Sequence, residues 1–473
     1  MNIFLLDERL VIDAVSSVSP LWPAGRAGDA VSADSDDPAE LAESAVSAVS
    51  AAERFARAAW SGIAEPGDAT AGRLVAALGS AAALECVVAR QSPATILGLA
   101  RDAGATVGTA AEVEAALERW KPRLTTSTVL TSMRQAERCG ARLIVPTDHE
   151  WPEGLGGLGP HQPVALWARG RPNAVLGLRS AIAVVGARAA SGYGEHMAME
   201  LSAGLADRGF GIVSGAAYGI DGMAHRSALA SSGQTFAFLA GGVDRFYPTG
   251  HDALLTRIAE VGVVLSELPC GSAPTKWRFL QRNRLIAAAA LATVVVEAGV
   301  RSGSLNTAAH AAALGRPLGA VPGPVTSPSS AGCHRLLREF DAVCVTTPDE
   351  VVQLVGEVQH ASPQPVLRGL EALEKPRNGA SPASGAPPGG AAPGEAPAGG
   401  APPGGTPPST QSRRPAEQVR VLDALGRRTP RSVNEVARRA GLGVAAAQSA
   451  LGALGLEGVV EEQRGGWRSV PSG

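Results

Sequence analysis

The stretch AIAVVGARAASGYG, residues 181–194, sets the pattern for the middle of the chain. Its apolar run predicts a strand, and its glycine-rich continuation predicts a loop that opens a helix near Tyr193. Similar apolar runs alternate with helical stretches, as GIVSG (211–215), TFAFLAGG (235–242), GVVLSE (262–267), TVVVEAG (293–299) and PLGAVPG (317–323). Strands this apolar are covered on both faces, so residues 141–360 are predicted to form an α/β domain with a doubly wound parallel sheet.

The regions on either side differ from this one in composition. Apart from a candidate helix near Pro38 to Ala51, residues 1–52 are expected to form an acidic disordered arm, because nine acidic residues and two arginines fall within the first 50. Residues 53–140 have helical periodicity, whereas residues 361–415 are rich in Pro, Gly and Ala and are expected to be a flexible linker. Residues 416–473 predict three short helices and a hairpin turning at Gly465-Gly466, which is the order of a winged helix.

The composition excludes several classes of protein. The 473 residues carry a formal net charge of -2, but the acidic arm hides a positive balance in the rest of the chain. Five cysteines occur without any C-x-x-C pair, which fits thiols in a reducing cytosol, and neither a metal site nor a cofactor is predicted. The longest apolar run, Leu285 to Val296, is far shorter than the roughly 20 residues that span a bilayer. We therefore expect a cytoplasmic protein without a membrane partner.

The candidate site lies in the loops that follow the strands, because open parallel sheets bind ligands beyond the carboxyl ends of their strands. The first loop offers Gly186 and Arg188, and the second, IVSGAAYGID (212–221), offers Ser214 and Gly215. Amides at a helix start together with an arginine can hold an anion. The fourth loop adds a further group of small and hydroxyl residues where a helix begins, namely Ser302, Gly303, Ser304 and Thr307.

The third loop, PTKWRFLQRNRLIAAAA (274–290), combines basic and aromatic residues. Its cations are Lys276, Arg278, Arg282 and Arg284, joined by Arg301 beyond the next strand, and they surround Trp277 and Phe279. Basic groups hold phosphates and exposed rings stack on bases, so this loop is typical of single-strand binding. The alternative is that Phe279 belongs to the core and that the arginines pair with Glu267 or Glu297.

These loops contain no recognisable catalytic motif. The sequence has no Ser-His-Asp order in matching loops, no H-E-x-x-H and no Walker motif. His225 and His310 fall inside predicted helices, where packing is the commoner role of a histidine. Asp221 and Glu297 could serve as acid and base, but the sequence does not fix their separation. The pattern thus indicates several anion sites and no enzyme.

The chain contains, in this order, the motifs VVGARAASGYG, VSGAAYGID, GGVDRFYP, FLQRNRLIAAAA, VVVEAGVRSGSLNTA and GRPLGAVPG. Together they resemble the bacterial DNA-processing protein A family, also called Smf, from about Ile144 to Val343. The resemblance implies an extended Rossmann-like domain that binds single-stranded DNA, protects it and helps load the RecA recombinase in natural transformation and recombination. It also implies a homodimer, a preceding helical domain of sterile-alpha-motif or helix-hairpin-helix type, and a following winged helix.

The resemblance also implies which residues bind DNA. The family's phosphate pocket would here consist of Arg188, Ser214, Gly215, Lys276, Arg282, Asn283, Arg284, Ser302, Gly303, Ser304 and Thr307, with Phe279 stacking on a base. Two positions depart from the family pattern. Leu280 follows Phe279 where the family has proline, which loosens a turn, and His334 stands where the family has asparagine.

Two other functions fit parts of the sequence. A nucleotide-processing enzyme of the phosphoribohydrolase type, which cleaves nucleoside monophosphates, can share this fold. Such enzymes carry a P-G-G-x-G-T-x-x-E signature, and EAGVRSGSLNTA (297–308) lacks its glutamate. A transcription factor that reads duplex DNA would involve only residues 432–454, and winged helices also bind proteins.

Overall fold

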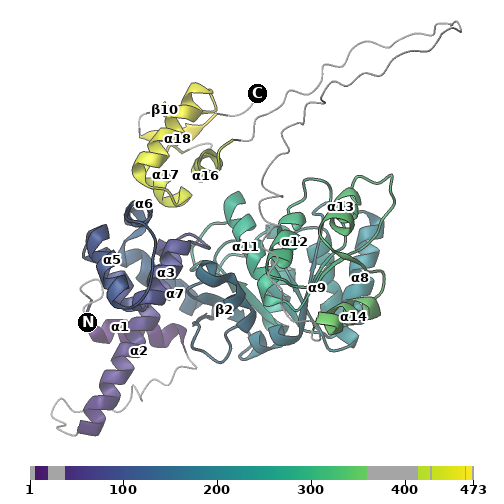
Figure 1. Ribbon diagram of the computed structural model, residues 1–473, viewed down its shortest axis with the longest axis horizontal. Coiled ribbons are helices and arrows are strands. Elements are labelled where there is room, and N and C mark those ends of the chain that lie inside the picture. Colours follow the sequence, from purple (N-terminus) through teal and green to yellow (C-terminus); the bar gives the residue numbers. More distant parts are fainter. Residues whose placement is uncertain (1–5, 20–37, 359–413, 427–428, 464, 471–473) are drawn as a thin grey trace, which may run out of the picture.

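The computed structural model describes residues 6–19, 38–358, 414–426, 429–463 and 465–470 (Figure 1). Their main sheet has the strand order β1-β2-β6-β5-β4-β3-β7-β8-β9. Its strands are β1 (Ala141–Ile144), β2 (Leu166–Gly170), β3 (Ala181–Val185), β4 (Gly211–Ser214), β5 (Thr235–Phe238), β6 (Val263–Ser266), β7 (Thr293–Val295), β8 (Leu318–Ala320) and β9 (Val343–Cys344). Strands β3 to β9 pair in parallel, whereas β2 runs antiparallel to both β1 and β6.

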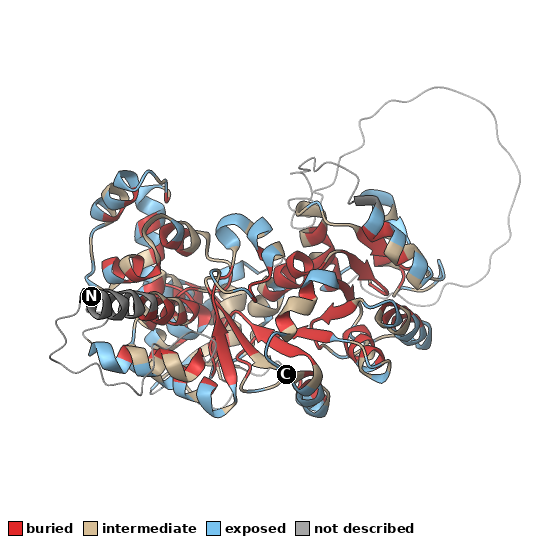
Figure 2. Cartoon of the chain, turned by 90° about the horizontal axis from the view of Figure 1, so that it is seen from below, coloured by how far each residue is buried: buried red, intermediate tan, exposed pale blue. Residues whose placement is uncertain are grey.

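Helices cover both faces of this sheet, which Figure 2 shows as buried strands between two layers. The helices are α8 (Gly192–Asp207), α9 (Ile220–Ala230), α10 (Asp252–Val261), α11 (Lys276–Ala289), α12 (Ser304–Ala313), α13 (Ala331–Glu339) and α14 (Pro348–Val358), with short 3-10 turns η3 (Glu153–His161), η4 (Ala174–Ser180) and η5 (Thr249–His251). Ile182 and Val184 of β3 share a core with α8, α9 and α14. Ala183 and Val185 share another with α11, α12 and α13. The predicted doubly wound parallel sheet is confirmed.

The order of the strands creates one switch point. The chain runs from β3 outward through β4 and β5 to β6, and then returns to place β7 on the other side of β3. The connections that follow β3 and β7 therefore diverge at the carboxyl edge of the sheet. Open α/β sheets bind their ligands at such a point.

The N-terminal helices share one core with the sheet. They are α1 (Glu8–Val18), α2 (Pro38–Ile63), α3 (Ala69–Leu78), α4 (Ser80–Val88), α5 (Pro93–Asp102), α6 (Ala110–Trp120), the 3-10 turn η2 (Lys121–Arg123) and α7 (Thr126–Arg138). The ring of Trp60 meets that of Trp120 edge-on, with 5.0 Å between centroids. Trp167 of β2 donates from Nε1 to Ser61 Oγ at 3.1 Å. One continuous cluster of buried apolar side chains joins these helices to β2, β5 and β6.

The structure corrects the prediction that residues 1–52 form a disordered arm. Residues 8–18 are the helix α1, which Asp7 caps by accepting a hydrogen bond from the Arg9 amide at 2.8 Å. Val11, Val15 and Val18 are buried, and α1 contacts α2 and α7. The expected boundary at residue 52 falls inside α2. The three valines have the spacing of one helix face, which the acidic composition obscured. The other domain boundaries stay predictions, and the linker expected at 361–415 lies almost wholly outside the described residues.

The C-terminal region forms the predicted winged helix. It consists of α16 (Ala416–Ala424), α17 (Val433–Ala440), α18 (Val444–Leu456) and the antiparallel strands β10 (Val460–Gln463) and β11 (Gly466–Ser469). Arg431 adds a bridge to Trp467 of β11. The buried apolar cluster of this unit contains only its own residues, among them Val436, Leu451 and Leu454. The winged helix therefore has an independent core.

Among the described helices, none alone has the length and apolar character needed to cross a membrane. Only α3 and α4 together reach that length and composition, and they meet at a bend of 114°. Leu74 and Leu84 of this pair are buried in the helical core.

His225 of α9 contributes to how stability responds to acid. Its ring is fully buried, and its Nδ1 lies 2.7 Å from Oγ1 of Thr235, whose hydroxyl donates to the Ile212 carbonyl. Burial lowers the pKa of His225 to about 3, so the folded ring is neutral, whereas an unfolded histidine takes up a proton below about pH 6.5. Stability therefore falls as the pH drops from 6.5 toward 3, by up to about 1.4 kcal/mol per pH unit.

We predict that His225→Gln removes this contribution. Between pH 6.5 and 5.5, the melting temperature of the sheet domain should fall by about 2–4 °C less in this variant than in the parent protein, as measured by calorimetry. The control His196→Gln changes an exposed histidine of α8 and should behave like the parent. Equal falls in parent and His225→Gln would contradict the prediction.

Candidate nucleic-acid interface

A cavity of about 660 Å³ opens at the switch point of the sheet. It is formed by the loops after β3, β4 and β7 together with one side of α11. Of the residues predicted from the sequence, it is lined by Gly186, Arg188, Phe279, Arg282, Asn283, Ser302, Gly303, Ser304 and Thr307. The fold thus brings most of the predicted site residues together from segments more than a hundred positions apart.

Phe279 forms an aromatic wall of this cavity and is only partly buried. It lies in the first turn of α11, which Thr275 caps by accepting from the Arg278 amide at 3.2 Å. The guanidinium carbon of Arg188 lies 5.0 Å from the ring centroid, and that of Arg282 lies 5.7 Å from it. Phe279 therefore lies in the wall of the cavity between two cations. It is not a core residue, which was the alternative interpretation.

Tyr247 is an aromatic residue that sequence reasoning did not single out. Its ring centroid lies 5.6 Å from that of Phe279, with the planes tilted by 53°, and the residue is 48% exposed. A signal was present in the sequence, since GGVDRFYP places this tyrosine in the loop after β5, at the carboxyl edge. The two adjoining rings offer a stacking surface for unpaired bases.

The first predicted anion site is already occupied by a carboxylate of the chain. Glu297 follows β7 and accepts hydrogen bonds from the amide of Ser191 at 2.9 Å and from its hydroxyl at 2.5 Å. Ser329 Oγ donates to the same carboxylate at 3.2 Å. A Cβ on Gly194 would collide with Glu297, which explains the glycine at that position. The N-terminus of α8 therefore binds Glu297, and the exposed Arg188 is the cation that this loop offers to a ligand.

The second loop is closed in the same way. Asp221 of α9 is buried, and its carboxylate accepts from the Gly215 amide at 3.2 Å and the Ala217 amide at 3.3 Å. The Gly186 amide donates to it as well. Burial raises the pKa of Asp221, and the neighbouring Arg282 guanidinium opposes that rise. The amides expected to hold phosphate thus bind an internal carboxylate.

Two predicted phosphate ligands are structural groups that do not line the cavity. The side chain of Arg284 is only 4% exposed, and its Nη2 donates to both oxygens of Glu267, at 2.8 and 2.7 Å, and to the His161 carbonyl at 2.9 Å. Ser214 is buried, and its hydroxyl donates to the Val184 carbonyl at 2.7 Å. For Arg284, the alternative of pairing with Glu267 is the arrangement that the structure contains.

Arg282 and Asn283 line the cavity but are tied to its walls. Arg282 donates to the carbonyl oxygens of Gly215, at 2.7 Å, and of Phe238. Burial lowers its pKa to about 10, so the guanidinium stays charged at neutral pH. The Asn283 amide donates to the Gly303 carbonyl at 3.3 Å. These residues make the cavity positive while holding α11 to the loops.

The groups available to a ligand lie where the cavity opens. Arg188 and Arg301 are both exposed. The helix α12 begins at Ser304, whose amide donates to Ser302 Oγ at 3.4 Å, and the hydroxyls of Ser302 and Ser304 lie 2.7 Å apart. Thr307 adds a hydroxyl one turn later in the same lining. Two guanidiniums and the start of a helix therefore share one cavity, an arrangement suited to phosphate.

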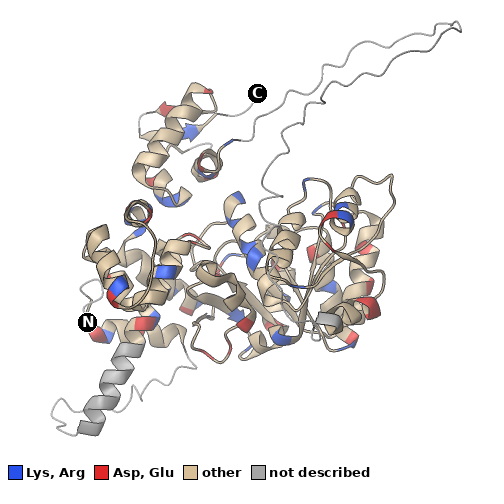
Figure 3. Ribbon diagram, in the orientation of Figure 1, with Lys and Arg blue, Asp and Glu red and all other residues tan. Residues whose placement is uncertain are grey.

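Lys276 and Arg278 lie outside this cavity, in the first turn of α11. Figure 3 shows the basic residues along α11. Arg278 pairs with Glu65, with 2.8 Å between Nη2 and Oε1. The side chain of Lys276 is exposed, but its backbone amide donates to Asp423 of α16 at 2.8 Å. The predicted third-loop cations are thus divided between the cavity, the core and contacts with other parts of the chain.

The two carboxylates that the sequence offered as acid and base are engaged in internal hydrogen bonds. Asp221 and Glu297 are each held by amides or hydroxyls of separate loops. The described part of the chain contains no cluster of three or more His, Cys, Asp or Glu that could hold a metal ion. His225 is buried in α9 and His310 packs within α12.

We predict that Arg284→Ala is strongly destabilising, because it leaves Glu267 buried without its partner. Breaking such a pair costs about 3–5 kcal/mol, and the melting temperature of the sheet domain should fall by roughly 6 °C or more. Arg188→Ala, at an exposed position, is the control and should change stability by less than about 0.5 kcal/mol. A parent-like melting temperature for Arg284→Ala would contradict this structural role and leave Arg284 as a candidate phosphate ligand.

Two family models match the chain. The model described as DNA recombination-mediator protein A matches residues 142–356, and the DprA winged helix domain matches residues 405–466. A DprA relative from Mycobacterium tuberculosis is 53% identical over 254 residues, which cover 52% of this chain and 62% of that protein. DprA of Bacillus subtilis is 34% identical over 203 residues, which cover 42% of this chain and 68% of that protein.

Among solved structures, DprA of Streptococcus pneumoniae aligns with 63% of this chain and 95% of its own, at 29% identity and a TM-score of 0.49. The chain matches about three fifths of the mycobacterial relative, at 62% of its length. The matched residues include the sheet, the cavity and the winged helix. The chain belongs to the DNA-processing protein A (DprA/Smf) family.

Proposed function

We propose that this protein binds single-stranded DNA at the cavity without sequence preference, protects it, and helps load the RecA recombinase during DNA uptake and recombination. The observation that carries the proposal is the meeting of two exposed arginines, the hydroxyl-bearing start of α12 and two adjoining aromatic rings at the switch point of the sheet. Cations and rings in one groove are the means by which proteins hold unpaired strands.

The exposed groups also support binding without sequence preference. Arg188 and Arg301 suit phosphates, which carry no sequence information. Phe279 and Tyr247 offer ring faces, and every base has a face on which such rings can stack. Duplex DNA hides the faces of its bases in the stack, so these rings favour a single strand.

The same geometry favours binding over catalysis. A phosphoribohydrolase needs a carboxylate placed at the substrate, whereas Glu297 is held by Ser191 and Ser329. The discriminating experiment compares the affinity for a labelled oligothymidine and for duplex DNA with the release of adenine from AMP. Adenine release without oligonucleotide affinity would favour the enzyme.

Family membership supports the parts of the proposal that concern partners. The family resemblance implies RecA loading, assembly as a homodimer and a cytoplasmic location. Light scattering with and without an oligonucleotide tests dimerisation and binding together. RecA loading is tested by following RecA filament growth on DNA covered by a single-strand binding protein, and an unchanged rate would remove that part of the proposal.

We predict that Arg188→Ala and Arg301→Ala each weaken oligothymidine binding at low salt. Each lost phosphate contact should reduce the slope of log affinity against log salt by about 0.7, as measured by fluorescence anisotropy between about 50 and 300 mM salt, a range over which screening changes. The control Arg257→Ala changes an exposed arginine of α10 that does not line the cavity and should leave the slope unchanged. Parent-like binding by both cavity variants would show that the cavity is not the phosphate site.

We predict a different signature for Phe279. Phe279→Leu removes the ring face and should weaken binding by the roughly 1–3 kcal/mol that stacking on one base contributes, with little change in the salt slope. Phe279→Tyr keeps the ring and should bind like the parent. If both variants bound equally, or if the salt slope changed in Phe279→Leu, the stacking role would be wrong.

A further inference from the structure

The first turn of α11 depends on the winged helix for hydrogen-bond partners. The first four amides of a helix need acceptors from outside the helix ladder or from its cap. Thr275 supplies two acceptors, its hydroxyl for the Arg278 amide at 3.2 Å and its carbonyl for the Phe279 amide at 3.0 Å. The Lys276 amide instead donates to Asp423 Oδ2 of α16 at 2.8 Å, and the Trp277 amide donates to the same carboxylate.

A second contact joins the same two helices. The guanidinium carbon of Arg420, one turn before Asp423 on α16, lies 5.4 Å from the ring centroid of Trp277. Asp423 and Arg420 therefore engage the amide of Lys276 and the ring of Trp277, which lie three and two residues before Phe279 of the proposed DNA site. Both contacts engage groups that a phosphate and a base could use instead.

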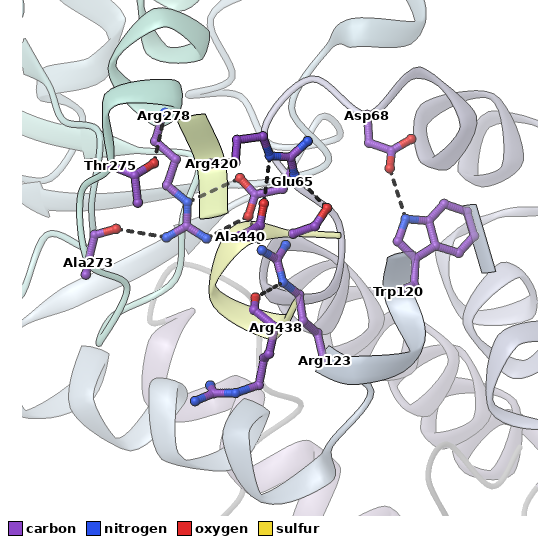
Figure 4. Close-up of polar contacts among 11 residues, drawn as sticks. Glu65, Asp68, Trp120, Arg123, Ala273, Thr275, Arg278, Arg420, Arg438 and Ala440 are labelled. Carbon is purple, nitrogen blue, oxygen red and sulfur yellow. Dashed lines mark hydrogen bonds and ion pairs between the residues drawn. The ribbon is translucent and has the colours of Figure 1, made fainter. Parts of the chain in front are cut away.

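Below this contact, one carboxylate joins three regions of the chain (Figure 4). Glu65, just after α2, pairs with Arg123 of η2 and with Arg278 of α11. Arg420 of the winged helix also contributes to lowering the pKa of Glu65 to about 2, so the carboxylate stays charged. Arg123 extends the joint by donating from Nε to the Arg438 carbonyl of α17 at 2.7 Å.

The charges in this joint limit how strongly the winged helix is held. Burial lowers the pKa of Arg420, Glu65 opposes that fall, and the guanidiniums of Arg123, Arg119 and Arg278 add to it. A carboxylate facing three guanidiniums leaves positive charge uncompensated, which limits the net gain from a buried ion pair. Undocking returns Arg420 to water and does not disturb the separate apolar core of the winged helix.

The docked geometry also requires a close approach. Gly441 ends α17 with a φ of +65°, and a Cβ at this position would collide with Glu65. The Arg420 guanidinium donates to the Gly441 carbonyl at 2.6 Å and to the Ala440 carbonyl at 2.7 Å. The C-terminus of α17 is thus shaped to seat against Glu65, so the contact with the rest of the chain is specific.

We propose that the winged helix is a reversible cover on the DNA-binding end of α11, such that docking of α16 and binding of a single strand along α11 exclude one another. This inference rests on the function proposed above and adds its regulation. In the docked form, Asp423 holds the amides and Arg420 holds the ring at the start of α11. A single strand entering the cavity competes for that turn with its phosphates and bases, and the winged helix is released.

The test uses Asp423→Ala in the full-length chain, with Glu417→Ala as the matched control. Glu417 is an exposed acid in the first turn of the same helix, so its removal changes the net charge equally but leaves the contact with α11 intact. Asp423→Ala should bind labelled oligothymidine about fivefold or more tightly than the parent, within the usual range of coupling between sites. Glu417→Ala should bind like the parent.

Hydrogen exchange supplies the second measurement. The amides of residues 276–278 should exchange faster in Asp423→Ala, whereas continued protection of residues 444–456 shows that the winged helix remains folded. If the parent binds DNA and Asp423→Ala binds no more tightly, the cover is wrong and the proposed function stands. If neither protein binds DNA, the proposed function fails and the cover fails with it. Binding by Asp423→Ala alone supports both.

Discussion

The charge of Arg282 holds the carboxyl edge of the sheet together. Its guanidinium joins the carbonyl of Gly215, just after β4, to that of Phe238, the last residue of β5, and it lies beside the buried carboxylate of Asp221. That carboxylate in turn gathers amides from the loops after β3 and β4. Removing either charge would leave the other buried without compensation. Gly215 belongs to the same constraint, because a Cβ there would overlap the guanidinium.

This constraint decides which kind of ligand suits the cavity. Internal carboxylates already occupy the amides that would hold one phosphate tightly, at α8 through Glu297 and at the second loop through Asp221. What remains is distributed: long guanidinium side chains, one helix start and two ring faces. Such a surface binds a single phosphate weakly. Its contacts add together in the binding free energy of a polymer with repeated phosphates and bases. The geometry therefore fits a nucleic-acid strand better than a mononucleotide.

The sequence predicted what depends on local signals. Apolar runs indicated the strands, glycine-rich turns indicated the loops, and their order predicted both the sheet and the winged helix. The sequence could not predict the partners of buried charges. Glu297 and Ser191, for example, are 106 positions apart and meet only through the strand order. Arg284 illustrates the limit, since the same residue type serves phosphate or Glu267 depending on burial. Composition averages likewise concealed the valine face of α1.

The continuous core beneath the N-terminal helices changes how the chain divides into parts. Trp167 of the sheet, Trp60 of α2 and Leu255 of α10 belong to one apolar cluster, so the helical layer is packed directly onto one side of the sheet. The winged helix has its own cluster. Disorder introduced into α2 would therefore spread to β2, β5 and β6, which share its cluster, whereas the winged helix has its own core and can stay folded.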